Sequence, residues 1–175
     1  MPDRAVTVIG FVVAELRASF TPGSARPPLG GGTDTVHILA GETVVPPPWL
    51  AGDNDSCSDC GPYLWVRLAR RWRAADQRSG GIFRDPHAGA CGQKRAITIE
   101  VGIARCHPPD GTPQELEEHA AIQWDDSWRI DNALCRALKI AEESQVITDS
   151  AIGPGEPSGP EGLAISWLQT AHAQM

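Results

Sequence analysis

Residues 95–115 read RAITIEVGIARCHPPDGTPQE, and this stretch decides the fold. Apolar residues alternate strictly along its first half, so one face collects Ile97, Ile99, Val101 and Ile103. A period of two is typical of a half-buried strand. The two prolines after His107 end that strand, because proline cannot donate a hydrogen bond to a neighbouring strand. The TPQE that follows is a capping box with proline at the first helical position, which predicts a helix.

This second element is predicted to be a long amphipathic helix from Pro113 to Glu143. On a helical wheel, one side collects the apolar residues Leu116, Ala120, Trp124, Trp128, Leu134, Cys135, Leu138 and Ala141. The other side collects the charged residues Glu115, Glu118, Asp125, Asp126, Arg129, Arg136 and Glu143. We therefore expect the first set in the core and the second in solvent. Ser127 and Asp131 interrupt the apolar side, which leaves a bend near the middle open.

A first helix is predicted from Asp3, as its cap, to Phe20. Its apolar stripe is Val6, Ile9, Val13, Leu16 and Phe20, at steps of three and four residues. A strand over residues 6–13 is the competing interpretation, because β-branched residues are frequent there. The helix is preferred, since the period continues for four turns.

Further strands are predicted at residues 36–45, 62–72 and 163–170. The one at 62–72 has bulky residues on both faces, so we expect it to lie centrally in the sheet or under a neighbouring subunit. The predicted fold class is α+β, with a mainly antiparallel sheet of about four to five strands packed against two helices.

A single domain spanning residues 1–175 is expected, with extended loops at about 22–35, 46–62 and 79–94. Glycine (18) and proline (15) cluster in these segments, and long loops of this kind often contact partners. The formal net charge of −7 argues against direct wrapping of nucleic acid, which requires a basic face. Glu15 and Arg17 interrupt the only early apolar run, so we expect neither a secretory signal nor a membrane span, and synthesis inside the cell.

The sharpest candidate for chemistry is the CxxC pair Cys57 and Cys60. With Cys91 and either Cys106 or His107 it would complete a tetrahedral zinc site. The gaps fit no standard zinc spacing, however, and thiols often pack as small apolar groups. We therefore predict no metal ligand, and a zinc-stabilised binding module is the weaker alternative.

Two charged clusters complete the set of candidates. The acidic cluster of Glu115, Glu117, Glu118, Asp125 and Asp126 suggests acid–base work in a cleft, but a solvated helix face explains it better. The basic cluster of Arg67, Arg70, Arg71, Arg73 and Arg78 is interleaved with Trp65 and Trp72. Its alternatives are nucleic-acid contact, cation–π pairing and a salt-bridged protein interface, of which we prefer the interface. No catalytic, cofactor-binding or metal-binding residue is predicted, and no enzyme activity.

Several weak motifs follow one another in a set order. The CxxC pair precedes LWVRL at 64–68, and Cys91 precedes IEVGIARC at 99–106. The capped helix contains DNALC at 131–135, and GPEG at 159–162 leads to a strand with Trp167. This order, over most of residues 57–170, resembles the neck proteins of long-tailed phages of actinobacteria, most closely their tail terminators. A cysteine- and glycine-rich turn that we expect of the family before its last strand is missing.

The resemblance implies a structural virion protein, assembled in the cytoplasm of the bacterial host. It implies a homo-oligomeric ring, hexameric, that ends tail-tube polymerisation and joins the tail to the head. The implied partners are other copies of the chain, the tail tube protein and a head-side connector or stopper protein, with no membrane. DNA would pass through the lumen only as the genome, beside an acidic lining drawn from Glu115–Asp126. A head–tail adaptor, a stopper or a minor capsid protein is the nearest alternative.

Overall fold

The computed structural model describes residues 3–40, 61–74, 94–106, 111–157 and 164–175. Within them the elements in chain order are α1 (Arg4–Phe20), β1 (Val36–Leu39), β2 (Tyr63–Ala74), β3 (Lys94–Cys106), α2 (Pro113–Glu143), β4 (Asp149–Pro157) and β5 (Ala164–Gln174). The predicted α+β class is confirmed. The predicted loops at 46–62 and 79–94 lie almost entirely outside the described residues.

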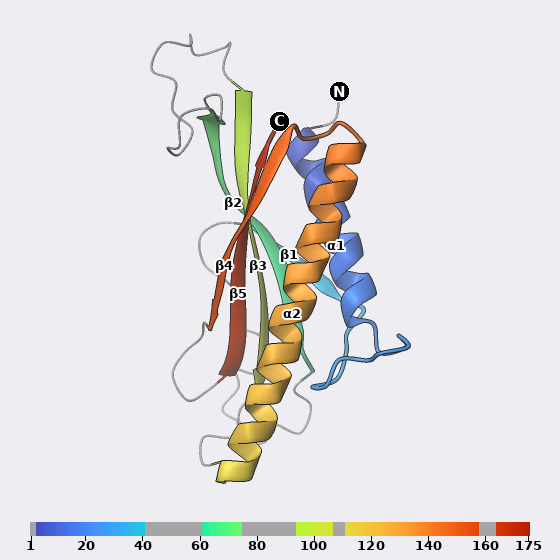
Figure 1. Ribbon diagram of the computed structural model, residues 1–175, viewed down its shortest axis with the longest axis vertical. Helices are drawn as coiled ribbons and strands as arrows, with labels where there is room; N and C mark the ends of the chain where they lie inside the picture. The colour runs from blue at the N-terminus through green and yellow to red at the C-terminus, as the bar shows by residue number, and fades with distance from the viewer. Residues whose placement is uncertain (1–2, 41–60, 75–93, 107–110, 158–163) are drawn as a thin grey trace.

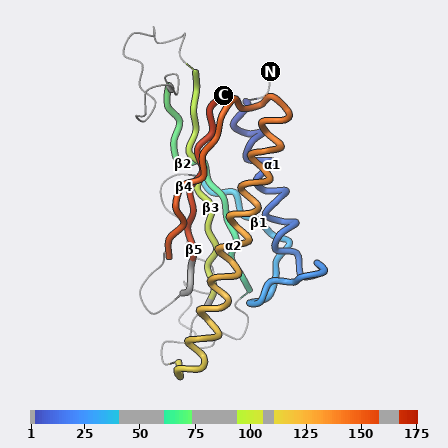
Figure 2. Tube along the Cα trace, in the orientation of Figure 1, coloured from blue at the N-terminus to red at the C-terminus, as the bar shows by residue number. Residues whose placement is uncertain are grey.

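The five strands form one sheet in the order β1-β2-β3-β5-β4. β1 pairs in parallel with β2, and the other three pairings are antiparallel, as predicted for most of the sheet. β3 is the central strand, and β2 is also an interior strand. Both helices cover the same face of the sheet and run side by side along it (Figures 1 and 2). The two chain ends lie at one end of the elongated molecule, and α2 begins at the other (Figure 1).

The core lies between the helices and the predicted apolar face of β3. Ile97, Ile99, Val101 and Ile103 are all buried. The register sets Leu64 opposite Ile103 and Val66 opposite Val101, so β2 adds its own apolar residues to the same face. β5 pairs with the opposite edge of β3 from β2. Its small residues Ala171 and Ala173 lie on the same face of the sheet as Ile97 and Ile99 and are buried. The strict alternation of β3 therefore correctly predicts which face of the strand is buried against the helices.

The predicted N-terminal helix is confirmed and the competing strand is wrong. α1 is capped by Asp3, whose carboxylate accepts a hydrogen bond from the Ala5 amide at 3.0 Å. Its predicted stripe is correct for Leu16 and Phe20 but wrong for Val6, which is 62% exposed. The buried residues of the helix are Ala5, Val8, Val12, Leu16 and Phe20. Apolar residues occupy several sides of this helix, so periodicity alone cannot choose between adjacent stripes.

The long helix has the predicted bounds, and its capping box is complete. The Thr112 hydroxyl accepts a hydrogen bond from the Glu115 amide, and the Glu115 carboxylate accepts one from the Thr112 amide at 2.6 Å. This backbone hydrogen bond lowers the pKa of Glu115. The Ser127 hydroxyl donates to the Trp124 carbonyl within the helix, which continues without interruption through this point.

The predicted faces of α2 are wrong over its first half. Trp124 and Trp128 are 68% and 61% exposed, and Leu116 is also exposed. Asp126 and Arg129, which we expected in solvent, are buried. At 100° per residue, the side predicted to be buried lies roughly a quarter turn around the helix from the side that is buried. The rotation of α2 follows from the buried ion pair between Arg105 and Asp126 and not from the position of its apolar residues.

β4 is a strand that was not predicted from the sequence, and β5 extends beyond the predicted end at Thr170 to Gln174. Glycines and prolines in GPGEP at 153–157 are typical of a turn. β4 is nevertheless an edge strand, with an irregular register between Ile152 and Gly155, and proline is tolerated at such positions. Gly155 also leaves room for the indole of Trp167, which a Cβ would approach to 2.6 Å.

Gly102 has the same role on the sheet face away from the helices. It lies opposite Trp65, and a Cβ there would lie 2.4 Å from the buried indole. We expect Gly102→Ala to destabilise the protein by about 1–3 kcal/mol, because the ring has no space to move. The matched control is Gly10→Ala on the exposed side of α1, where nothing lies within 4 Å of the added Cβ. It is expected to stabilise by about 0.5–1 kcal/mol in urea unfolding, and equal effects of the two changes would contradict this account.

The Asp3 cap of α1 makes the stability of the folded protein depend on pH. The Asp3 carboxylate accepts a hydrogen bond from Arg71 at 2.5 Å, and this contact, with the Ala5 amide, lowers the pKa of Asp3 below 3.8. Since the folded-state pKa is lowered, the stabilisation is present above pH 3.8 and disappears as pH falls through the folded value.

We therefore expect Asp3→Ala to lower the thermal midpoint at pH 7, and the difference from wild type to shrink below pH 3.8. Arg71→Gln keeps the cap and should lose only part of this pH dependence. A difference in midpoint that stays constant from pH 7 down to pH 2.5, measured by circular dichroism, would show that Asp3 does not titrate in this way.

Candidate functional site

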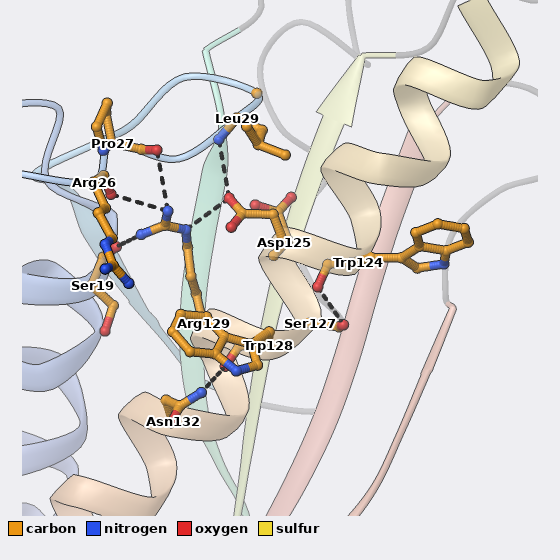
Figure 3. A network of polar contacts seen from close by, with 12 residues as sticks. Ser19, Arg26, Pro27, Leu29, Trp124, Asp125, Ser127, Trp128, Arg129 and Asn132 are labelled. Atoms are coloured by element: carbon orange, nitrogen blue, oxygen red, sulfur yellow. Dashed lines mark hydrogen bonds and ion pairs between the residues drawn. The ribbon is translucent and has the colours of Figure 1, made fainter.

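The best-defined polar cluster lies where the end of β3, the first half of α2 and residues 19–30 meet. We call it the helix–loop network: Arg105, Asp125, Asp126 and Arg129 with the backbone groups of residues 19–30 that they contact. Figure 3 shows the half of it around Arg129.

Arg105 and Asp126 form a buried, bidentate ion pair. The Arg105 Nε lies 2.6 Å from Asp126 Oδ2, and Nη2 lies 2.8 Å from Oδ1. Their side chains are 7% and 2% exposed. The third guanidinium nitrogen, Nη1, donates to the carbonyl of Gly30. Burial raises the pKa of Asp126, and the hydrogen bonds from Arg105 act in the opposite direction.

Arg129 joins α2 to the loop and to α1. Its Nε donates to Asp125 at 2.7 Å, and its terminal nitrogens donate to the carbonyls of Ser19, Arg26 and Pro27 at 2.9–3.1 Å. Asp125 in turn accepts a hydrogen bond from the Leu29 amide at 3.0 Å. Figure 3 shows these carbonyls converging on one guanidinium, while Trp124 points away from the cluster.

The helix–loop network therefore corrects the solvated-face interpretation of the acidic cluster. Asp125 and Asp126 are both paired with arginine, and neither is available to line a channel or to transfer a proton. Glu115 is part of the helix cap. Of the predicted cluster, Glu117 and Glu118 are the exposed carboxylates that belong neither to the cap nor to the helix–loop network. Arg105 was not predicted as a site residue, although it lies two residues after Ile103 and therefore on the buried face of β3.

The basic cluster is divided among different contacts. Arg67 forms an ion pair with Glu100 at 2.6 Å, and its guanidinium lies 5.9 Å from the Trp65 ring centroid. This geometry confirms the cation–π alternative for these two residues. Arg70 is exposed on β2, and Arg78 lies outside the described residues.

The remaining arginines gather at the end of the sheet where β2 ends and β3 begins. We call Arg71, Arg73 and Arg95 the arginine end. Arg73 and Arg95 are exposed and directly opposite each other in the register. With Trp72, Ala96 and Met175 these three arginines line an open cavity of about 310 Å³. Arg71 is paired with Asp3, so the cavity has an excess of positive charge.

A histidine and a hydroxyl meet on the sheet face away from the helices. The Thr98 hydroxyl lies 3.1 Å from His172 Nδ1, and burial lowers the pKa of His172. The two residues are direct partners in the β3–β5 register, and the imidazole packs edge-on against Trp72. Among the contacts described, no carboxylate is hydrogen-bonded to this imidazole, as a nucleophile–base pair would require. We interpret the pair as a cross-strand contact.

The zinc hypothesis rests on residues that the structure does not describe. Cys57, Cys60, Cys91 and His107 lie outside the described ranges, and so does the side chain of Cys106. Within those ranges, no group of three or more His, Cys, Asp or Glu side chains is placed to hold a metal ion. Cys135, predicted in the core, is an exposed free thiol on α2.

Comparison with protein-family models gives no match, and no curated protein matches the chain significantly. In the part of the chain that the structure describes, neither helix combines the length and the apolar character needed to cross a bilayer.

The network predicts a strongly non-additive pair of substitutions. Asp126→Ala leaves a buried guanidinium without its carboxylate and should cost about 3–5 kcal/mol. The double variant Arg105→Met/Asp126→Leu removes both charges and should recover most of that loss, because the pair itself pays a large desolvation cost. The control Arg136→Ala breaks a half-exposed pair with Glu15 and should cost less than about 1 kcal/mol. Additive losses in urea unfolding would contradict this account of the buried pair.

Proposed function

We propose that this protein is a structural component of the neck of a long-tailed phage. In this proposal it forms a ring that ends tail-tube polymerisation and joins the tail to the head-side connector. The motif order from Cys57 to Trp167 supports the family, and the fold supports a structural role through the surface that it exposes.

One observation supports assembly above all: two tryptophans of α2 lie more than half exposed. Trp124 and Trp128 are four residues apart, so they lie next to each other on one side of the helix. Tryptophan is enriched where proteins bind one another, and exposed apolar patches on single chains mark such sites. We define the tryptophan face as Trp124 and Trp128 together with Glu117, which shares their side of α2.

The polar clusters of the described residues support the same class of function. The helix–loop network, the capping box and the Arg67–Glu100 pair each have their donors and acceptors satisfied within the fold. Their geometry is explained by stability without any substrate. Val6, Leu29, Ile38 and Leu116 are exposed as well, but Trp124 and Trp128 are the largest exposed apolar side chains among the described residues.

Particles assembled without this protein test the proposal. Overlong or headless tails in electron micrographs are expected for a tail terminator, whereas filled heads without tails would indicate a stopper. Complementation with the wild-type gene is the control and should restore normal particles.

Mass measurement tests the ring directly. The mass of the purified protein is expected to be several times 18.7 kDa, and peptides of this chain are expected in purified virions. A strictly monomeric protein that is absent from particles would contradict the proposed function. Metal analysis of the same sample separates the zinc alternative, since less than about half an equivalent of zinc per chain argues against a structural zinc site.

A further inference from the structure

An excess of basic residues and a cluster of acidic residues lie at different ends of the described structure. At the end with the chain termini, the exposed basic residues Arg4, Arg71, Arg73, Lys94 and Arg95 outnumber the exposed acidic residues Asp3, Glu142 and Glu143. The start of α2, at the other end of the long axis, includes the exposed acidic residues Glu115, Glu117 and Glu118 (Figure 1). The acidic cluster of one copy is therefore complementary in charge to the arginine end of another.

The arginine end is electrostatically unfavourable in a single chain. Arg73 and Arg95 are direct cross-strand partners, and like charges in that position destabilise a sheet. Asp3 compensates Arg71 through their ion pair at 2.5 Å. Carboxylates supplied by a partner would reduce the repulsion between the other two arginines.

The cavity at the arginine end also has the volume and the lining chemistry to accept an aromatic ring. Its lining combines the guanidinium groups with Trp72, Ala96 and Met175 in an open volume of about 310 Å³. Arginine stacks favourably on tryptophan, and the apolar members exclude water from such a contact.

The tryptophan face supplies both complementary groups on one helix side. Trp124 follows Glu117 by seven residues and Trp128 follows four later, so at 100° per residue all three point the same way. All three are exposed, and the buried Asp126 lies on the opposite side of the helix. The surface thus presents a carboxylate beside two indole rings.

We propose that the tryptophan face of one copy docks on the arginine end of the next copy. Glu117, assisted by Glu118, pairs with Arg73 and Arg95, and a tryptophan enters the cavity. The contact joins two different surfaces, so it is heterologous and can close into a ring. The inference rests on the proposed ring and names the surfaces that form it. An acidic partner is favoured over nucleic acid because the chain has a net charge of −7 and the opposing surface is aromatic.

Charge reversal tests the contact with an internal rescue. Variant A is Arg73→Glu/Arg95→Glu, and variant B is Glu117→Arg/Glu118→Arg. Each alone sets like charges against each other and should weaken self-association at least about tenfold in analytical ultracentrifugation. A one-to-one mixture of A and B makes both types of contact complementary again, so it should assemble into alternating oligomers.

Two further variants complete the design. Trp124→Ala/Trp128→Ala should weaken association without changing the far-ultraviolet circular dichroism, since both side chains are exposed. Lys139→Glu, a charge reversal about three turns further along α2 than Trp128, should associate like wild type. The contact is salt-dependent, so association of wild type should weaken as ionic strength rises.

The outcomes separate this inference from the proposed function. Rings of variants A and B that form as in wild type would overturn the contact and leave the neck function standing. Wild type that stays monomeric at every concentration overturns the contact too, and presence or absence in particles then decides the neck function. If variant A instead loses binding to a fluorescent DNA duplex with its assembly unchanged, the arginine end binds phosphate and the inference is wrong.

Discussion

The ion pair between Arg105 and Asp126 is the interaction on which the rest of the structure depends. Arg105 follows four buried residues on the same face of β3, so its charge enters the core-facing layer and requires a carboxylate there. Asp126 supplies it from α2. Because the pair is bidentate, it fixes the distance between helix and sheet and also the rotation of the helix about its axis. The exposure of Trp124 and Trp128 follows from that rotation.

The same network explains how a segment rich in glycine and proline is held in place. Its contacts with α2 and β3 are made mostly by backbone carbonyls. Those of Arg26 and Pro27 accept hydrogen bonds from Arg129 of α2, and that of Gly30 accepts one from Arg105 of β3. Such contacts do not depend on the side chains of the loop. Gly30 is the exception, because a Cβ there would lie 2.6 Å from Ile122 and 2.9 Å from the Arg105 guanidinium.

Periodicity and capping chemistry made most of the fold predictable. Alternation identified β3, the capping box identified the start of α2, and the two helices and their layer against the sheet were predicted. The rotation of α2 was not predicted, because a helical wheel considers apolar residues alone and leaves out ion pairs such as Arg105–Asp126. The rotation of α1 was not predicted, because apolar residues are frequent on several of its sides. β4 was missed because its glycines and prolines have the composition of a turn, while its pairing depends on β5, a neighbour later in the chain. The tryptophan face was missed because Trp124 and Trp128 were assigned to the core. Arg71 and Arg73 of the arginine end belonged to the predicted basic cluster, whereas Arg95 was not singled out.

The composition of β4 has a consequence for how copies of this chain can join. Many sheets polymerise by adding a neighbour's strand to a free edge, a route that requires a regular row of backbone donors. Along the β4 edge, Pro154 and Pro157 offer no donor, and the irregularity after Ile152 disturbs the spacing of the others. This edge therefore resists uncontrolled growth of the sheet from chain to chain. Association through side chains on α2, in contrast, has a defined geometry and stops when the available surfaces are filled.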